Sequence, residues 1–447
     1  MKIDDKVFLI PLFSSFQQDT IRYAVMRNAE TLPFDLGDGD IDLLIHPDDF
    51  QQGVTMIKRV ALACGGGVVA ETHSLMFCQV ELAGCKEGVW WGLCLDIFAE
   101  VRYRGFAKLV DDSIFLQCVQ TPNKIWTFPD DVGSLLGFLK ELLYNGKYTE
   151  RYASLARRAV ETGRHASFPC LQKKILSLLN RILQQGSVST SEASRIRRGV
   201  NRQACAQNPL RYLVDRALFV GARLRRVFKP AGRMVAVLGT DGAGKSTLLD
   251  AALPLLLKVA HGSVIVHHLK PDLLPPLARL KGRTDRPRGP VKDPHGSKSS
   301  GFLGSCMRVT YLTVDYLAGY WIKVFPLLIK VPPTIYVFDR YAYDMLFDGK
   351  RLRIALPEWM IKSALLFVPR PDRIICLGGD PEILVERKKE LSLEEVKRQV
   401  AALHTWAETQ PRASFLSTTE PLEETVDAFM RALLLNPPQT NVPSLSD

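Results

Sequence analysis

The cysteines of this chain lack any spacing that is typical of a metal site, a redox pair or a disulfide scaffold. Nine cysteines are spread along 447 residues, and no two of them form a C-x-x-C pair. The sequence also lacks a recognisable signal peptide and an uncharged apolar run of about 18 residues, the length that a membrane span needs. The richest candidate, Tyr311 to Ile329, is interrupted by Asp315 and Lys323. These absences predict reduced thiols in a cytoplasmic protein without a transmembrane segment.

The sequence is not acidic, and it shows no internal repeat and no recognisable motif for DNA or RNA. Its 58 Lys and Arg outnumber its 47 Asp and Glu, which gives a formal net charge of +11. This balance favours anionic partners such as nucleotides, phosphorylated sugars, glycan ends and anionic membrane surfaces, so peripheral membrane contact stays open. Without a nucleic-acid motif, we do not expect DNA or RNA as a partner. The oligomeric state does not follow from these features.

Length and composition predict several globular domains of α/β class. With 47% hydrophobic and 23% charged residues, 447 residues exceed one typical core. Glycine and proline thin out after Asp131, where the pattern becomes helical, and Pro230 to Arg233 marks a second boundary. We therefore expect a mixed α/β domain 1–130, a helical connector 131–230, a parallel-sheet domain 231–435 with flanking helices, and a disordered tail 436–447.

Hydrophobic periodicity places the main elements of the N-terminal domain. It predicts helices at Gln17–Asn28 and Val54–Cys64, and strands at Ile41–Ile45 and Val89–Val101. Arg211–Arg226 is basic and amphipathic, with apolar positions at Leu213, Ala217, Leu218, Val220 and Leu224. We favour a packed linker helix there over a helix on a membrane surface.

A second basic segment lies inside the third domain. Leu280–Ser300 holds lysines and arginines among glycines and prolines, which predicts a mobile loop. The loop is either a solvated insertion or a flap that meets a polyanionic acceptor.

The stretch from Gly239 to Thr247 fits G-x-x-x-x-G-K-[ST], the phosphate-cradling P-loop. The apolar strand Met234–Leu238 precedes it, and a helix-forming segment, Leu248–Lys258, follows. Strand, glycine-rich turn and helix together point backbone N–H groups at an anion. We expect Lys245 to reach the β- and γ-phosphates and the Ser246 hydroxyl to bind Mg²⁺, so the predicted cofactors are ATP and Mg²⁺. The predicted phosphate-binding residues are Gly239, Thr240, Asp241, Gly242, Ala243, Gly244, Lys245, Ser246 and Thr247.

A second chemical centre follows about a hundred residues later. Thr334–Phe338 is an apolar strand that ends in Asp339 and Arg340, which is typical of a Walker-B position. Asp339 could hold Mg²⁺ or orient an acceptor, and Arg340 could contact the transferring phosphate. Pro381–Leu391 predicts a helix that runs into a cationic cluster with Arg387, of the kind that closes over a site. If the acceptor is a hydroxyl, Asp241, Asp339, His267 and His268 are the candidate bases.

These motifs together resemble the thymidylate kinase family of P-loop kinases, over about residues 233 to 434. The resemblance implies a parallel sheet wrapped by helices, with Lys245, Asp241, Asp339, Arg340 and Arg387 as catalytic residues. The basic segment 280–300 departs from a compact nucleoside monophosphate kinase. Asp344–Asp348 with Arg351 and Arg353 resembles a divergent branch that we associate with bacterial surface-polysaccharide genes.

The N-terminal domain carries an acidic motif of its own. Asp40 and Asp42 are two residues apart at the start of the strand Ile41–Ile45, where alternation sends both to the same side, and Asp96 lies on the later strand. Converging carboxylates suit Mg²⁺. The pattern resembles the nucleotidyltransferase superfamily, although Arg27-Asn28 stands where that superfamily has a Gly-Ser pair. The alternative is an acidic strand in a domain that only binds or positions a substrate.

The sequence therefore predicts an ATP- and Mg²⁺-dependent phosphotransferase, or kinase, with a nucleotidyltransferase-like domain 1–130. Its expected acceptor is a nucleotide, a sugar phosphate or a glycan end, with surface-polysaccharide metabolism as one implication of the resemblance. A thymidylate kinase is the alternative within the same class. An ATP-regulated binding module with incidental turnover is the alternative of another class, since a pure binder needs only the P-loop and not Asp339, Arg340 and Arg387.

Overall fold

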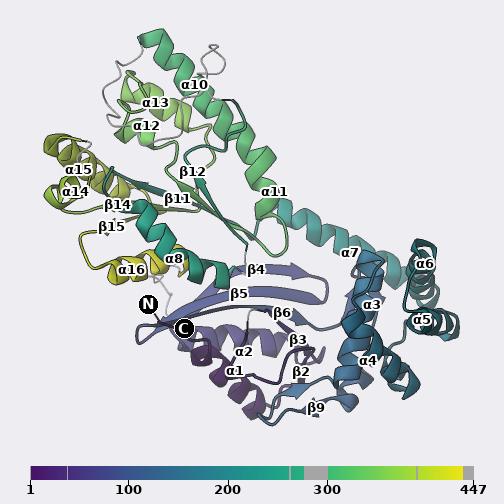
Figure 1. Ribbon diagram of the computed structural model, residues 1–447. Helices are drawn as coiled ribbons and strands as arrows, with labels where there is room; N and C mark the ends of the chain where they lie inside the picture. Colours follow the sequence, from purple (N-terminus) through teal and green to yellow (C-terminus); the bar gives the residue numbers. More distant parts are fainter. Residues whose placement is uncertain (1, 38, 261–262, 276–300, 389–390, 436–447) are drawn as a thin grey trace, which may run out of the picture. The chain divides into compact units, whose positions relative to one another are not determined.

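The computed structural model describes residues 2–37, 39–260, 263–275, 301–388 and 391–435. These residues form two compact units, Lys2–Lys229 and Pro230 onwards, which we describe separately (Figure 1). The predicted basic loop 280–300 and the predicted tail 436–447 lie outside the described residues.

The first unit is built on a mixed sheet. Its strand order is β4-β5-β6-β3-β2-β10-β9, with β1 paired to β6. The strands are β1 (Lys2–Ile3), β2 (Tyr23–Val25), β3 (Ile41–Ile45), β4 (Gly66–Ser74), β5 (Phe77–Lys86), β6 (Val89–Phe98), β9 (Val119–Gln120) and β10 (Trp126–Thr127), and a small separate hairpin is formed by β7 (Arg102–Tyr103) and β8 (Ala107–Lys108). The strand predicted at Ile41–Ile45 is confirmed, and the strand predicted at Val89–Val101 ends at Phe98.

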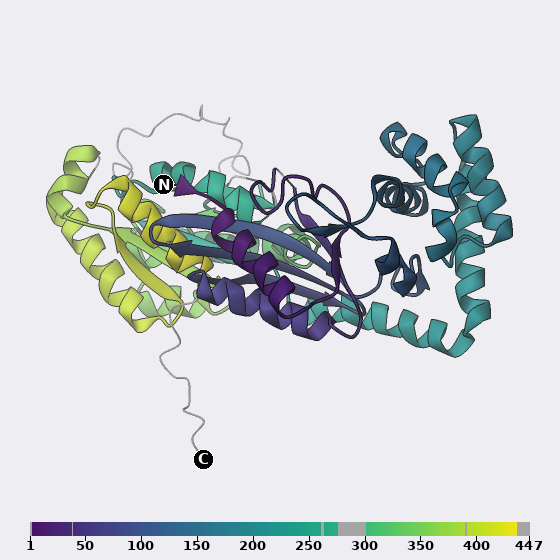
Figure 2. The ribbon, with the colours of Figure 1, turned by 90° about the horizontal axis from the view of Figure 1, so that it is seen from below.

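Helices α1 (Lys6–Gln18) and α2 (Phe50–Ala63) cover one face of this sheet (Figure 2). Alternation along β3 turns Ile41, Leu43 and Ile45 into the core beneath these helices. Asp42 therefore faces the opposite side of the sheet, where Leu44 joins the second core of the unit. The sheet thus separates an apolar layer from a face that carries carboxylates.

The prediction of a helix over Gln17–Asn28 is wrong. Helix α1 ends at Gln18, Thr20 takes a positive φ of 51°, and the chain then enters β2. Every residue of β2 is buried, so the strand shows none of the alternation that distinguishes a half-buried strand from a helix in sequence.

Helices make up most of residues 130–228. They are α3 (Asp130–Asn145), α4 (Glu150–Glu161), α5 (Lys173–Gln185), α6 (Thr190–Gln207) and α7 (Pro209–Phe228), with a short 3₁₀ turn η2 (Arg164–Ser167). Another 3₁₀ turn, η1 (Asp112–Gln117), precedes them. Leu135, Leu139 and Leu142 of α3 share a core with Ala24 and Leu44 of the sheet. The helices and the sheet thus belong to one compact unit, and the role of 131–230 as a connector stays a prediction.

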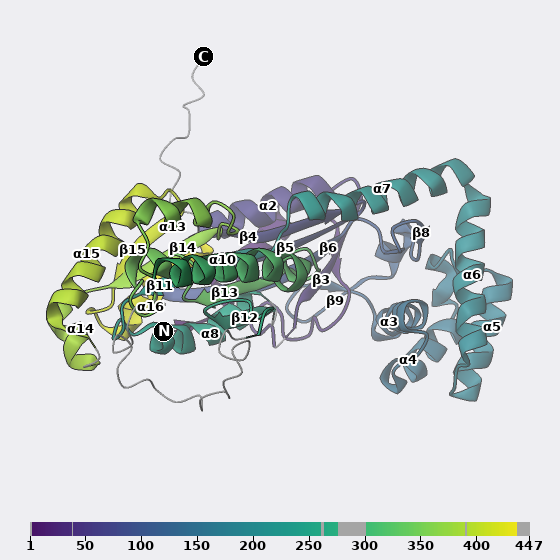
Figure 3. The ribbon, with the colours of Figure 1, turned by 90° about the horizontal axis from the view of Figure 1, so that it is seen from above.

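Helix α7 packs with the face opposite to the one expected. It meets α6 in a sharp bend at Asn208, whose side chain caps α7 (Figure 3). Leu213, Leu218 and Leu224, predicted to be packed, are exposed, and Asp215 is the buried residue of the helix. The packed-linker prediction is therefore wrong for these positions.

The second unit is a parallel α/β sheet in the order β12-β13-β11-β14-β15, which confirms the predicted class. Its strands are β11 (Arg233–Gly239), β12 (Val264–His268), β13 (Ile335–Asp339), β14 (Arg373–Gly378) and β15 (Ala413–Ser417). Its helices are α8 (Lys245–Val259), α10 (Phe302–Gly319), α11 (Phe325–Leu328), α12 (Asp344–Phe347), α13 (Glu358–Leu365), α14 (Pro381–Arg387), α15 (Leu393–Thr409) and α16 (Leu422–Leu434), and a π-helical turn η3 (Tyr320–Val324) joins α10 to α11.

Helices cover both faces of the parallel sheet, with α8 and α16 on one side and α10 on the other (Figure 1). Since all five strands run parallel, their carboxyl ends lie at one edge. Gly239, His268 and Asp339 end three neighbouring strands there, where ligands bind in open α/β sheets.

Candidate active sites

The turn between β11 and α8 has the geometry of a phosphate-binding loop. Gly242 and Gly244 take positive φ angles of 85° and 68°, which glycine adopts without a steric penalty. A Cβ atom on Gly242 would lie 2.4 Å from the backbone oxygen of Leu384, so α14 packs directly on the loop. Helix α8 begins at Lys245, and its first-turn residues Ser246 and Thr247 are exposed. The N–H groups of that turn are the ready anion site of a helix N-terminus.

The Lys245 side chain is folded into the loop. Its Nζ donates hydrogen bonds of 2.8 Å to the backbone oxygens of Gly239 and Thr240. Burial, with a contribution from Arg340, lowers the pKa of Lys245 to about 7. This lysine is a buried cation whose charge the protein alone does not fully stabilise.

Asp339 lies beside the loop because β13 pairs in parallel with β11, with Val237 opposite Asp339. Its Oδ2 lies 3.0 Å from Nδ1 of His268, which ends the neighbouring strand β12. Among the described residues, its buried Oδ1 has no hydrogen-bond partner. An unsatisfied carboxylate oxygen beside the P-loop suits Mg²⁺, which takes oxygen ligands. The residues present therefore fit the predicted cofactor.

Asp241, within the loop, is held by several cations. Its carboxylate lies 2.5 Å from Nη2 of Arg340, 2.7 Å from Nη1 of Arg351 and 3.9 Å from Nζ of Lys388. Burial works to raise the pKa of Asp241, but Arg340 and Arg351 outweigh it and hold the pKa below its ordinary value. A carboxylate with these partners is a poor proton acceptor, which weighs against Asp241 as a general base.

Arg340 itself is buried, with a φ of 78°, and its second partner is Asp344 at 3.2 Å. Burial raises the pKa of Asp344. Arg351 and Lys388 were not among the predicted site residues, although the charged segments that hold them were noted. Their convergence on Asp241 depends on tertiary packing that sequence spacing does not reveal.

Two predicted residues point elsewhere. Helix α14 ends at Arg387 rather than continuing to Leu391, and Arg387 Nη1 donates a 2.8 Å hydrogen bond to the backbone oxygen of Thr418. His267 Nε2 lies 2.7 Å from the backbone oxygen of Lys270, so its ring is engaged locally. Of the two histidines, only His268 contacts the candidate site, through Asp339.

The N-terminal carboxylates converge as predicted. Asp42 of β3 and Asp96 of β6 are opposite each other in a parallel pair, and carboxylate oxygens of Asp40, Asp42 and Asp96 lie within 4.8 Å of one another. Burial, with contributions from Asp42 and Asp40, raises the pKa of Asp96 to about 6 although Gln79 donates a 2.7 Å hydrogen bond to it. Like charges held together in this way are typical of a cation site.

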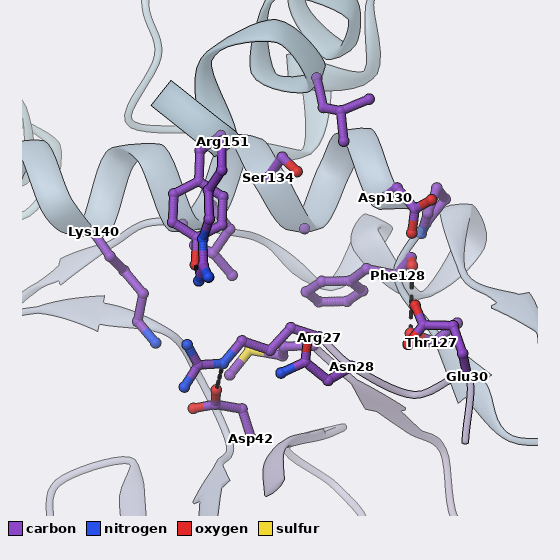
Figure 4. Close-up of a pocket in the computed structure, with 17 residues that line it drawn as sticks. Arg27, Asn28, Glu30, Asp42, Thr127, Phe128, Asp130, Ser134, Lys140 and Arg151 are labelled. Carbon is purple, nitrogen blue, oxygen red and sulfur yellow. Dashed lines mark hydrogen bonds and ion pairs between the residues drawn. The ribbon is translucent and has the colours of Figure 1, made fainter. Parts of the chain in front are cut away.

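Arg27 spans two of these carboxylates, with Nε 2.5 Å from Asp42 and Nη2 3.3 Å from Asp40. A pocket of about 310 Å³ adjoins them, lined by residues of α3 and α4 together with Arg27, Asn28 and Asp42. Figure 4 shows Lys140, Arg27 and Asp42 pointing toward one another, with Arg151 on the opposite wall. The pocket therefore combines a carboxylate cluster with cationic walls.

A third group, Glu71, His73 and Cys78, also has metal-type side chains close together. Lys58 Nζ lies 2.6 Å from Glu71, and His73 Nε2 lies 2.8 Å from it. Glu71 is thus already paired with neighbouring donor groups, and we interpret this cluster as an ion-pair network.

Comparisons with known proteins give little further guidance. No protein-family description and no curated protein sequence matches the chain. Among solved structures, thymidylate kinase from Ehrlichia chaffeensis is similar at 13% identity and a TM-score of 0.32, over 46% of this chain and 100% of that chain. Likeness at this level carries no argument about function. In the described residues, no helix is long and apolar enough to cross a membrane.

Proposed function

We propose that the unit from Pro230 onwards is an ATP- and Mg²⁺-dependent phosphotransferase. One observation carries the proposal: a P-loop with left-handed Gly242 and Gly244 lies beside Asp339, whose buried Oδ1 lacks a partner among the described residues. Phosphoryl transfer needs positioning and charge stabilisation, and these are the groups that supply both.

The loop residues Gly239–Thr247 hold the donor phosphates in this proposal, and Lys245 exchanges its two carbonyl partners for phosphate oxygens. Ser246 and Asp339 are the protein ligands for Mg²⁺, which neutralises charge on the phosphates when bound. Arg340 and Lys388 lie within reach of the loop through Asp241, while Arg387 needs to release Thr418 before it can act.

The acceptor is anionic in this proposal, as a nucleotide, a sugar phosphate or a glycan end. Arg340, Arg351 and Lys388 gather around Asp241, with Arg340 shared between Asp241 and Asp344, and such a group of cationic side chains suits an anionic ligand. If the acceptor instead reacts through a hydroxyl, the Asp339–His268 pair is the available base, because Asp241 is neutralised by its arginines.

For the first unit we propose a nucleotidyltransferase-like site. Asp40, Asp42 and Asp96 are its Mg²⁺ ligands, and Lys140 and Arg151 are its anion-binding groups. The short contact between Arg27 and Asp42 competes with a cation for the same oxygen. If that ion pair persists, the site binds or positions a substrate without catalysing transfer.

The test is transfer of the γ-phosphate from labelled ATP·Mg²⁺ to thymidylate and then to sugar phosphates and glycan ends. Lys245→Ala is the blank, and Lys258→Ala, at the other end of α8, is the matched control. If the wild type and Lys258→Ala transfer phosphate to thymidylate and Lys245→Ala does not, the protein is a thymidylate kinase. Intact ATP binding without transfer to any acceptor would reject the proposed phosphotransferase.

A binding module regulated by ATP is the competing function. Arg387→Ala and Lys388→Ala separate the two, with the exposed Lys397→Ala as control. A phosphotransferase loses turnover in at least one of these variants while ATP affinity is retained. A binding module keeps its low basal turnover in all of them.

A further inference from the structure

Helix α7 presents an apolar face to solvent. Leu213 is 61% exposed, Leu224 is 57% exposed and Phe228 is 83% exposed. Leu210, Val214 and Leu218 are also exposed and lie on the same side, at the three- and four-residue spacing of one helical face. We call these six residues the α7 apolar stripe. The stripe has two parts, Leu210–Leu218 and Leu224–Phe228, and exposed apolar residues grouped on one side of a helix in this way mark an interaction site.

The opposite face of α7 fixes the orientation of the stripe. Asp215 is buried in an ion pair with Arg102, and the Tyr212 ring packs 4.9 Å from the Phe106 ring. A Cβ atom on Gly105 would lie 2.6 Å from the Phe219 ring, so this ring is pressed against the backbone of the β7–β8 hairpin. The stripe therefore cannot turn inward without breaking these contacts.

Exposed arginines border the stripe on both sides. At about 100° per residue, Arg211 falls along one edge and Arg216 and Arg223 along the other, while Arg225 lies within the stripe, between the directions of Val214 and Leu218. Asp215 is the single acidic residue in the α7 sequence, and it is buried. The exposed part of this helix thus combines an apolar centre with uniformly positive margins.

We propose that the α7 apolar stripe lies on an anionic lipid surface. A bilayer supplies apolar acyl chains to the stripe and negative headgroups to both arginine edges at once. A second copy of α7 would place arginines against arginines. A helix with an apolar stripe between arginine edges lies in the plane of the interface. This inference is independent of the proposed phosphotransferase.

The experiment is co-sedimentation of the full chain with vesicles of phosphatidylcholine alone or mixed in equal parts with phosphatidylglycerol. The protein binds the mixed vesicles, and binding weakens as salt is raised. Arg216→Gln with Arg225→Gln weakens binding about 30-fold, since each arginine near an anionic surface contributes about 1 kcal/mol. Leu213→Gln with Leu224→Gln weakens it at least about tenfold.

The matched control is Arg195→Gln with Arg198→Gln, which removes the same charge from exposed positions of α6. This pair leaves vesicle binding unchanged, and all variants keep the wild-type melting temperature because the altered side chains are exposed. Equal binding to neutral vesicles, no binding to either kind, or equal weakening by the α6 pair overturns the proposal. So does a stripe variant that melts earlier or changes oligomeric mass, because protein then covers the face.

Discussion

Lys245 and Asp339 are buried groups of opposite charge, and the protein does not fully compensate either of them. The Lys245 Nζ donates to two carbonyl oxygens, and nearby Asp241, Asp344 and Asp339 only partly offset the effect of its burial on its pKa, while Asp339 has a buried oxygen without a partner among the described residues. Each group is costly to bury in this condition. A bound triphosphate with Mg²⁺ would place an anion beside Lys245 and a cation beside Asp339. Separate experiments on the two residues can therefore measure what each contributes to binding and turnover.

Asp339→Asn should lower the turnover number about 100-fold while ATP affinity changes less than about threefold, because the loop still holds the phosphates. Steady-state kinetics and calorimetry measure the two effects. Asp250→Asn, on the exposed side of α8, is the control. A variant with full turnover would remove Asp339 from the reaction centre.

ATP binding should be linked to protonation of Lys245. The free group has a pKa of about 7, and phosphate charge raises it, so binding takes up about one proton at pH 8 and about none at pH 6. Calorimetry in buffers of different ionisation enthalpy measures the uptake. The apparent affinity falls as pH rises above 7. The same uptake at both pH values would contradict this assignment.

Asp96→Asn should stabilise the first unit while removing its cation site. The pKa of Asp96 is raised to about 6, so its charged form is disfavoured in the folded protein. That cost grows as pH rises from the ordinary aspartate pKa to about 6 and is complete above it. The variant should therefore gain more in melting temperature at pH 8 than at pH 5, and lose Mn²⁺ binding at pH 8. Asp48→Asn, at an exposed position, should change neither.

At the scale of elements, α14 packs against the P-loop, so the conformation of the loop depends on the position of the helix. The backbone oxygen of Leu384 occupies the space that a side chain at position 242 would need. A substitution there has both a steric and a conformational cost, because Gly242 also has a φ of 85°.

Gly242→Ala should destabilise the second unit by about 1–3 kcal/mol, or about 2–12 °C in melting temperature, and weaken ATP binding. Gly67→Ala, where the added methyl group has no atom within 4 Å, is the control. Differential scanning fluorimetry with and without ATP makes the measurement. An unchanged melting temperature would show that α14 moves aside freely.

The sequence predicted the elements of the second unit better than their contacts. The P-loop strand, Walker-B strand and α8 follow from apolar runs and glycine spacing, which are local signals. The convergence of Arg351 and Lys388 on Asp241 is not local, because each of the two residues lies more than a hundred positions after the loop in the sequence. The exposed face of α7 was misjudged for the same reason, since amphipathic spacing identifies an apolar face without identifying what covers it.

At the scale of the whole molecule, two compact units each carry a candidate nucleotide site of different design. One uses a glycine-rich loop with a lysine, and the other uses a carboxylate cluster with cationic walls. The net charge of +11 is consistent with anionic ligands at both.

ATP·Mg²⁺ should protect the two units unequally from hydrogen exchange. At a concentration of about 100 times Kd, binding should stabilise the second unit by about 2.7 kcal/mol. Slower exchange should appear in peptides around Gly239–Leu248 and Ile335–Arg340. Lys245→Ala should abolish this protection. Protection in peptides around Asp42 and Asp96 that survives Lys245→Ala would instead locate a second nucleotide site.

The parallel pairing of Asp42 with Asp96 limits where insertions and deletions can occur as this sequence evolves. Along β3 the core positions Ile41, Leu43 and Ile45 alternate with Asp42 and Leu44, and Asp40 comes just before the strand, so one inserted or deleted residue exchanges the two sets. The carboxylates would then be driven under α1 and α2, and isoleucines would face the pocket. A single-codon insertion or deletion in β3 would therefore destroy the core and the site together. Length variation among descendants of this sequence should therefore be confined to the turns and excluded from β3.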